Sequence, residues 1–257
     1  MLNFYSNKKN FEDISFDDLF NINGNVVRSS KNRETVEFLF KNKKYFIKRF
    51  SKGSLVQNFL NRVGVVNDVS NAENEFNAYK ILQDIGVETP KLVCYGNEKK
   101  IWNNRSLVIS EEIKNFEQLD FFFTKNKYHK VKKNFEDQIY KKVVEIVSRL
   151  HENGIIHHDL YLCHFLLDLN SLDDKKNNLK IYLIDFHRLQ KKNSIRTSRL
   201  IKELGDLLFS IKYFGDEEKY HKILKANYFN RNMLKIYENN IQKRANAMLT
   251  KYKNKYG

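Results

Sequence analysis

The sequence predicts an α+β protein built in two lobes, an N-terminal antiparallel sheet with one helix and a mainly helical C-terminal part. Runs of β-branched and aromatic residues fill the first third of the chain, and helical periodicity dominates after residue 135. A polar segment near residues 110–114 separates the two patterns. We therefore expect an N-lobe at 1–112 and a C-lobe at 113–257.

The N-lobe pattern consists of three strands, a helix and two more strands. Hydrophobic runs predict strands at 26–27, 36–40 and 45–47, with a turn at 41–44 between the last two. The next strands are expected at 92–95 and 107–109.

The predicted N-lobe helix spans 71–85. One face of it is apolar, and that face carries Ala72, Phe76, Tyr79 and Leu82. Gly86 stands where this helix should stop.

The C-lobe pattern begins with a helix at 136–152, whose apolar residues recur at helical spacing and which Gly154 ends. An apolar pair at 155–156 and a polar segment at 157–159 follow. Two short apolar runs, 165–167 and 181–184, flank a polar turn. The rest of the chain is expected to be helical.

The composition bounds the function. The chain has 257 residues, 41% of them hydrophobic, and a formal net charge of +15. Such a charge favours anionic partners, namely nucleic acid, a phosphate-rich glycolipid, an anionic membrane or an acidic protein. Lys recurs throughout the sequence, so most single lysines are expected to be solvated surface.

The two cysteines, Cys94 and Cys163, form no disulfide framework and no zinc-ligand pattern. With no signal-peptide or membrane-spanning pattern, we expect a cytoplasmic protein.

The central motif is Ile156-His157-His158-Asp159-Leu160-Tyr161-Leu162-Cys163-His164. It matches the kinase catalytic loop H-R-D-L-x-x-x-N, with Asp159 at the position of the base. His164 stands where that loop has its metal-binding Asn, and His158 replaces the Arg. Downstream, Ile184-Asp185-Phe186-His187 resembles a strand that runs into D-F-G, which makes Asp185 the candidate magnesium ligand.

The N-lobe supplies the candidate nucleotide site. Tyr45-Phe46-Ile47-Lys48 resembles the V-A-I-K strand, so Lys48 would hold the ATP phosphates. Glu75 is its expected ion-pair partner, because the alternative, Glu73, would point about 200° away around the helix. Gly24 and Arg28 lie in the segment expected to cover the nucleotide. Glu111, beside the predicted hinge, completes the candidates.

Each motif alone is weak, but their order along the chain is that of a protein-kinase-like fold. The chain has no A-P-E segment, because its one proline is Pro90. Only a short polar stretch, 191–198, precedes the next apolar helix. This leaves little room for a peptide-docking platform, so a small or glycolipid acceptor is favoured.

The run 154–167 and the segment 179–188 together resemble the lipopolysaccharide core heptose(I) kinases, of the Kdo/WaaP-type lipopolysaccharide kinases. In that family His also replaces the loop Asn, and Asp-Leu/Phe-His-Arg replaces D-F-G. The resemblance covers roughly residues 22–212, and His158, where the family has Arg, is its main departure.

The resemblance implies Asp159 as base, Asp185 with His164 at Mg²⁺, and Lys48 on ATP. It further implies transfer of the γ-phosphate to a hydroxyl of the first core heptose, on the cytoplasmic face of the inner membrane.

Acceptor binding and membrane contact are further expectations. Arg188, Arg196 and Arg199, with Lys191 and Lys192, follow the metal Asp and could contact acidic sugars or phosphates. Two segments could touch a membrane surface: the apolar positions of 55–63 beside Lys52 and Arg62, and 121–123 before Lys125 and Lys127. Packing between lobes is the alternative for both.

Three rival functions stay open. One is a kinase of the same fold that acts on Kdo or another small molecule. Another is a catalytically inactive kinase-like binding protein, since the glycine loop is degenerate. The third is a basic nucleic-acid binder, which lacks a recognisable motif here.

Overall fold

The computed structural model describes residues 2–6, 11, 13–30, 32–51, 72–98, 105–172, 179–228 and 231–256. It divides into two compact units. The first comprises Met1–Ile81 and Pro90–Ile113, and the second comprises Leu82–Thr89 and Lys114–Gly257. The membrane-contact segment predicted at 55–63 lies outside the described residues.

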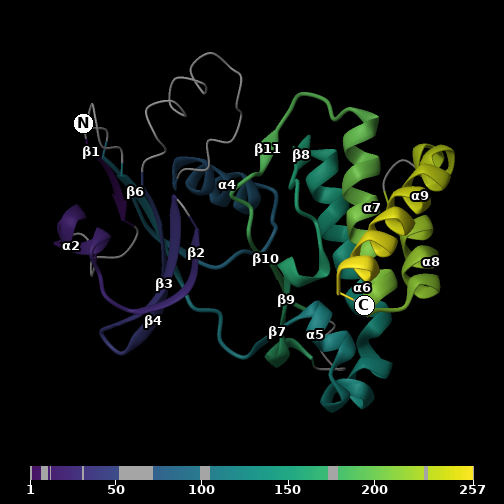
Figure 1. Cartoon of the computed structure of the whole chain (residues 1–257), viewed down its shortest axis with the longest axis horizontal. Helices are drawn as coiled ribbons and strands as arrows, with labels where there is room; N and C mark the ends of the chain where they lie inside the picture. The colour runs from purple at the N-terminus through teal and green to yellow at the C-terminus, as the bar shows by residue number, and fades with distance from the viewer. Residues whose placement is uncertain are drawn as a thin grey trace. The chain divides into compact units, whose positions relative to one another are not determined.

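A six-stranded antiparallel sheet forms the first unit, in the order β1-β5-β6-β4-β3-β2 (Figure 1). Its strands are β1 (Leu2–Ser6), β2 (Asn25–Ser30), β3 (Arg33–Phe40), β4 (Lys43–Phe50), β5 (Leu92–Glu98) and β6 (Arg105–Glu111). Five of these six strands contain the runs that the sequence predicts. β1, which pairs with β5, has no counterpart in the predicted pattern.

Local chemistry explains the β3–β4 hairpin. Lys41 and Asn42 both have positive φ, 47° and 60°, which is the backbone of a two-residue turn that matches the twist of the strands. Along β4 the side chains alternate, so that Tyr45 and Ile47 are buried in the core against β3. The predicted turn at 41–44 is therefore confirmed, although it is two residues shorter.

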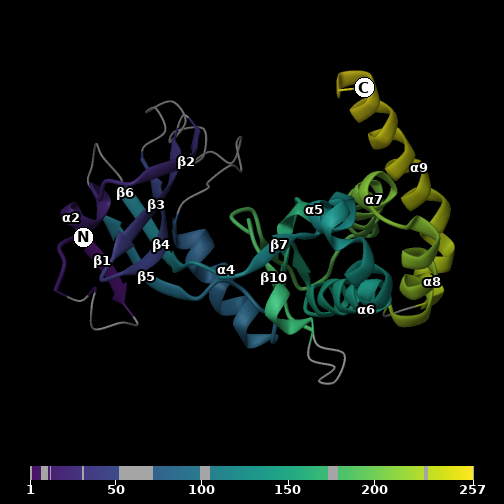
Figure 2. The ribbon, with the colours of Figure 1, turned by 90° about the horizontal axis from the view of Figure 1, so that it is seen from below.

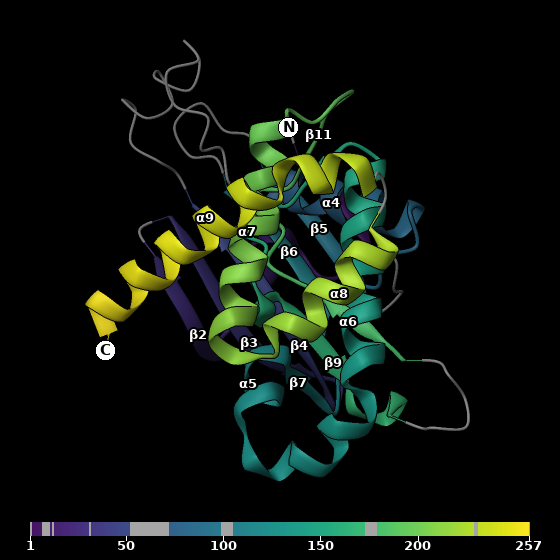
Figure 3. The same ribbon diagram turned by 90° about the vertical axis from the view of Figure 1, so that its right-hand side faces the viewer.

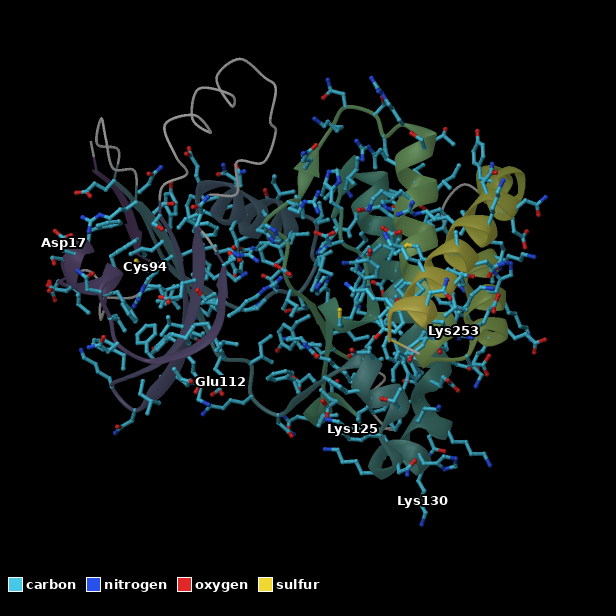
Figure 4. All side chains as sticks on the ribbon, in the orientation of Figure 1. Asp17, Cys94, Glu112, Lys125, Lys130 and Lys253 are labelled. Atoms are coloured by element: carbon cyan, nitrogen blue, oxygen red, sulfur yellow. The ribbon has the colours of Figure 1, made fainter. Side chains whose placement is uncertain are left out.

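Two helices, α2 and α4, lie between strands of this sheet along the chain. The short α2 (Phe16–Phe20), absent from the predicted pattern, is capped by Ser15, whose hydroxyl accepts from the backbone N–H of Asp18. Figure 4 places Asp17 on the outer side of this helix, where its carboxylate pairs with Arg105 of β6 at 2.5 Å. α4 (Ala72–Asp84) matches the predicted helix and buries all four apolar positions of its predicted face.

The second unit is mainly helical (Figure 2). Its helices are α5 (Leu119–Thr124), α6 (His129–Glu152), α7 (Thr197–Phe214), α8 (Glu217–Asn227) and α9 (Arg231–Tyr256). α6 begins seven residues before the predicted helix start, because the basic, amphipathic stretch before residue 136 continues the same helix. α9 lies across α7, as Figure 3 shows.

Two small antiparallel sheets accompany these helices, with the orders β10-β9-β7 and β11-β8. Their strands are β7 (Phe116–Gln118), β8 (Ile155–Ile156), β9 (Phe165–Asp168), β10 (Ile181–Leu183) and β11 (Gln190–Lys191). Three 3₁₀ turns complete the described elements: η1 (Asn126–Tyr128), η2 (Leu162–His164) and η3 (Leu169–Ser171). The predicted fold class, a sheet-rich N-terminal part and a mainly helical C-terminal part, is confirmed.

For the aromatic segment 121–123, the sequence left membrane contact and packing as alternatives. Phe122 and Phe123 are buried in the core of the second unit, and only Phe121 is exposed, at 47%. Lys125 covers the ring of Phe121 from 4.7 Å, and Lys130 projects away from α6 (Figure 4). Packing therefore accounts for two of the three rings. Among the described helices, none is long and apolar enough to cross a membrane.

Candidate active site

The predicted Lys48–Glu75 pair lies in the first unit. Lys48 Nζ on β4 lies 2.5 Å from Glu75 Oε1 on α4. The carboxylate is almost completely buried, with 1% of its side chain exposed, whereas the Lys48 side chain is 23% exposed. A buried carboxylate needs such a partner, and the lysine keeps one accessible side for a ligand. Glu73 points elsewhere, within 3.4 Å of the Asn97 amide.

The other predicted nucleotide residues belong to the same sheet. Gly24 precedes β2 and packs so close to β3 that an added Cβ would lie 2.1 Å from the Glu37 carbonyl oxygen. Arg28 is exposed on β2, at an irregularity in the pairing with β3. Glu111 ends β6 and donates its backbone N–H to the Lys91 carbonyl at 2.9 Å. A glycine is needed at 24 for this close approach of two strands.

The loop of the central motif follows β8 in the second unit. His157 is fully buried, and its Nε2 donates to the Ile184 carbonyl at 3.1 Å, which ties the loop to the end of β10. His158 has a left-handed backbone, with φ of 74°. Residues other than glycine seldom adopt this backbone conformation. It recurs at functional sites, where the surrounding structure holds it. It brings Asp159 to the start of an irregular segment that ends in η2.

Asp159 is part of an ion pair. Its two carboxylate oxygens each lie 3.2 Å from Nη1 of Arg188. The Asp159 side chain is 26% exposed and the Arg188 side chain 50%. The candidate base is therefore accessible, and the contact holds it beside a cation from the segment that follows Asp185.

His164 links Asp159 to Asp185. Its Nδ1 donates to the Asp159 carbonyl oxygen at 2.6 Å, which leaves Nε2 as the lone-pair nitrogen, 3.5 Å from Asp185 Oδ2. The other Asp185 oxygen lies 2.8 Å from His187 Nδ1. Asp185 itself has φ of 59°. The structure thus brings together the predicted base and both predicted metal ligands.

The Asp185 carboxylate is the kind of oxygen ligand that Mg²⁺ takes beside nucleotide phosphates, whereas an imidazole nitrogen such as His164 Nε2 is better suited to softer metals. Asp185 is only 19% exposed, and His164 turns its lone pair toward the same side. Among the described residues, no group of three or more His, Cys, Asp or Glu side chains converges as a metal cage. Mg²⁺ in phosphate-transfer sites commonly takes one or two protein ligands, with phosphates and waters as the rest.

The predicted acceptor residues lie in one segment. Arg196 caps the N-terminus of α7 and Arg199 lies in its first turn, and both are exposed. Burial lowers the pKa of His158, and the positive charges of Arg199 and Arg188 lower it further. Both guanidinium groups therefore lie near the loop of the central motif. In the described part of the chain, Arg188 alone of the three has a hydrogen bond to Asp159.

A buried polar group behind the loop was missed by the sequence analysis. Glu203 of α7 accepts a short hydrogen bond from the backbone N–H of His158, and its other oxygen lies 3.0 Å from His151 Nε2. Burial opposes ionisation of Glu203, but the hydrogen bond and charge of His151 prevail and lower its pKa. A charged residue such as Glu203 inside the otherwise apolar helix 200–211 was the sequence signal that could have indicated this buried group.

The same helix also holds the carbonyl of His158. Lys202 Nζ donates to that oxygen at 2.9 Å and to Asp206 Oδ2 at 2.7 Å. Asp206 is fully buried, and its other oxygen pairs with Arg244 of α9, 2.7 Å from Nε and 2.6 Å from Nη2. Two side chains of α7, Glu203 and Lys202, therefore hold the backbone N–H and the backbone carbonyl of His158.

Two titrating groups of this site are held neutral. Burial lowers the pKa of His157 to about 4, so its imidazole is uncharged near neutral pH. Burial raises the pKa of the Cys163 thiol to about 12, which excludes a thiolate nucleophile at this position. Cys94 and Cys163 are both free cysteines.

Comparison with known proteins identifies relatives of this chain. The profile of the "Lipopolysaccharide kinase (Kdo/WaaP) family" matches residues 17–237. The lipopolysaccharide core heptose(I) kinase WaaP of Escherichia coli is 29% identical over 201 residues, 78% of this chain and 76% of that relative. The enzyme of the same name from Pseudomonas aeruginosa is 26% identical over 222 residues, 84% of this chain and 80% of that relative.

A solved structure described as WaaP in complex with acyl carrier protein has the same fold. Its TM-score is 0.70 at 23% sequence identity, and the match covers 94% of this chain and 92% of that one.

Proposed function

This chain belongs to the lipopolysaccharide kinase (Kdo/WaaP) family, and from that premise we propose that it transfers the γ-phosphate of ATP to a hydroxyl of an inner-core heptose. It is thus a phosphotransferase that acts on a sugar hydroxyl. The two relatives described above carry the name heptose(I) kinase, which favours heptose over Kdo or another sugar as acceptor.

The observation that carries the proposal is the chain of contacts from Asp159 through His164 to Asp185. Phosphoryl transfer requires a carboxylate beside the acceptor hydroxyl and a second carboxylate at the metal. We assign Asp159 to accept the hydroxyl proton. Asp185 and His164 would hold Mg²⁺, which, when bound, neutralises charge on the phosphates.

The first unit has a matching role in the proposal. A lysine that is ion-paired to a buried helix glutamate, and still partly exposed, is suited to hold ATP phosphates. We assign Lys48 and Glu75 to this task, and Gly24, Arg28 and Glu111 to the nucleotide site around them. In this proposal the lobe 1–112 covers the nucleotide and the lobe 113–257 carries the catalytic loop and the acceptor site.

Two rivals lose support from particular contacts. An inactive, kinase-like binding protein has no need of a buried glutamate paired with Lys48, nor of a clamped catalytic loop. A nucleic-acid binder would be expected to expose several stacking aromatics among its basic groups, whereas Phe122 and Phe123 are buried and Phe121 alone of the segment 121–123 is exposed, under Lys125.

Partners and location follow from the same proposal. The acceptor is a glycolipid of the inner core, held at its anionic groups by Arg188, Arg196 and Arg199. The net charge of +15 suits peripheral contact with the cytoplasmic face of an anionic inner membrane, and it suits an acidic protein partner. The solved WaaP complex with acyl carrier protein makes such a protein the first one to test.

The test uses purified protein, MgATP and dephosphorylated core glycolipid, read by mass spectrometry. We expect one added phosphate, located on the first heptose by fragmentation. Phosphate found on Kdo or on a different sugar would support the kinase activity but contradict heptose as the acceptor. No phosphate on any sugar, with the protein folded, would contradict the proposal.

A further inference from the structure

The contact between Arg188 and Asp159 has a consequence for which acceptors can react. The only nitrogen of Arg188 engaged with Asp159 is Nη1, which lies 3.2 Å from both carboxylate oxygens. In the proposed reaction, one of these two oxygens receives the proton of the acceptor hydroxyl. While the guanidinium stays there, it competes with the hydroxyl for the same oxygens.

This ion pair is suited to be exchanged. Arg188 is half exposed, and exposed ion pairs are weak because solvent screens them. Guanidinium groups bind most tightly when two of their N–H groups form parallel hydrogen bonds to one carboxylate or phosphate. Contact through a single nitrogen at 3.2 Å does not use that geometry, so an incoming anion can offer Arg188 a better partner.

The surroundings of Arg188 favour an anion at this place. Lys191, Lys192, Arg196 and Arg199 are all exposed in the same segment. The charges of Arg188, in the turn before β11, and of Arg199, on α7, both act on His158, which is next to Asp159. An anionic group on the acceptor would therefore be drawn to the neighbourhood of the base.

We infer that Arg188 is a specificity-determining residue that leaves Asp159 for a carboxylate or phosphate of the acceptor, so that only an anionic acceptor frees the base. In the reaction that follows, the acceptor oxygen forms a bond to the γ-phosphorus and the bond from that phosphorus to the β,γ-bridging oxygen breaks. The hydroxyl proton passes to Asp159, and ADP leaves. This inference rests on the proposed kinase function.

The experiment measures kcat/KM with three acceptors, all without phosphate on the heptoses: core glycolipid that keeps its other phosphates, the same glycolipid with its sugar carboxylates methyl-esterified, and the same glycolipid stripped of all phosphate. With wild-type protein, kcat/KM for the unmodified glycolipid should be at least tenfold higher than for the preparation that lacks the recognised anion. If methyl esterification lowers kcat/KM, the anion is a carboxylate, and if removal of phosphate lowers it, the anion is a phosphate. In Arg188→Gln the preference should fall to about one. The base is then free without an anion, so the rate with the acceptor that lacks the recognised anion should rise, while the anionic acceptor loses its cationic partner.

Two further variants sharpen the result. Arg188→Lys keeps a charge but not the planar fork, and it should retain part of the preference. Lys253→Gln removes one positive charge from α9 and should leave the preference unchanged. A residue with a purely structural role would lower all three rates together, so an unchanged preference in Arg188→Gln would overturn the inference. If wild-type protein phosphorylates none of the three acceptors, the proposed function fails instead.

Discussion

The backbone N–H of His158 donates a hydrogen bond to the buried carboxylate of Glu203, and this contact connects the catalytic loop to α7. His158 is the residue before the candidate base, and its φ of 74° needs support from its surroundings. Glu203 therefore sets the course of the backbone that presents Asp159, although it lies outside the loop itself.

Glu203→Ala should impair both folding and catalysis. Removing the acceptor leaves the buried N–H of His158 unsatisfied, which costs about 1–3 kcal/mol in the free energy of unfolding. Urea unfolding measures this loss, and kcat should fall at temperatures where the variant is fully folded. Glu203→Gln, which can still accept from that N–H, should recover much of the activity. Equal kcat for Glu203→Ala and wild type would contradict the positioning role.

Lys48→Met should prevent productive ATP use and also destabilise the first unit. The substitution leaves the Glu75 carboxylate buried without its cation, a change that costs roughly 3 kcal/mol for buried pairs. The double variant Lys48→Met/Glu75→Gln should regain stability, because no uncompensated charge remains, but it should not regain activity. A double variant with wild-type turnover would show that the pair is structural.

Gly154→Ala should destabilise the protein more than Gly86→Ala, a matched glycine variant. Gly154 has φ of +72°, and an added Cβ would lie 2.1 Å from the Lys192 carbonyl oxygen, beside the β8–β11 pairing. Gly86 has a similar φ of +67°, but there the nearest atom is the flexible Arg149 Nη1 at 2.9 Å. We expect losses of about 3 kcal/mol for Gly154→Ala and about 1 kcal/mol for Gly86→Ala in thermal unfolding. Similar losses for both variants would show that the backbone contact is unimportant.

His157 should make stability fall in mild acid. Because burial lowers its pKa to about 4, the unfolded chain binds a proton that the folded chain refuses between about pH 6.5 and 4. The free energy of unfolding therefore decreases as the pH falls through this window, by up to roughly 3 kcal/mol from this group. His157→Gln can still donate to the Ile184 carbonyl but does not titrate. Its stability should depend less on pH across that window, and parallel curves for the two proteins would refute the assignment.

How far the sequence predicts this protein depends on the range of the interactions. Alternation in Tyr45-Phe46-Ile47 and the helical face of Ala72, Phe76, Tyr79 and Leu82 are local signals, and these elements lie where they were expected. β1 and β11 are held by pairing with residues far along the chain, which no local period reveals.

The site shows the same division. The motif predicts which side chains act, and the spacing on α4 selects Glu75 over Glu73 as the partner of Lys48. The contacts of Arg188 with Asp159 and of Glu203 with His158 join residues 29 and 45 positions apart, so only the fold reveals them.

Transfer of labelled γ-phosphate from ATP to core glycolipid by Asp159→Asn is the most direct check on the central assignment. Asn keeps the size of the side chain but cannot accept the hydroxyl proton, so transfer should drop by at least about a hundredfold. Asp137→Asn, at a carboxylate that is 64% exposed on α6, should transfer phosphate like wild type. Transfer by Asp159→Asn at the wild-type rate, with the fold intact, would contradict the role of Asp159 as the base.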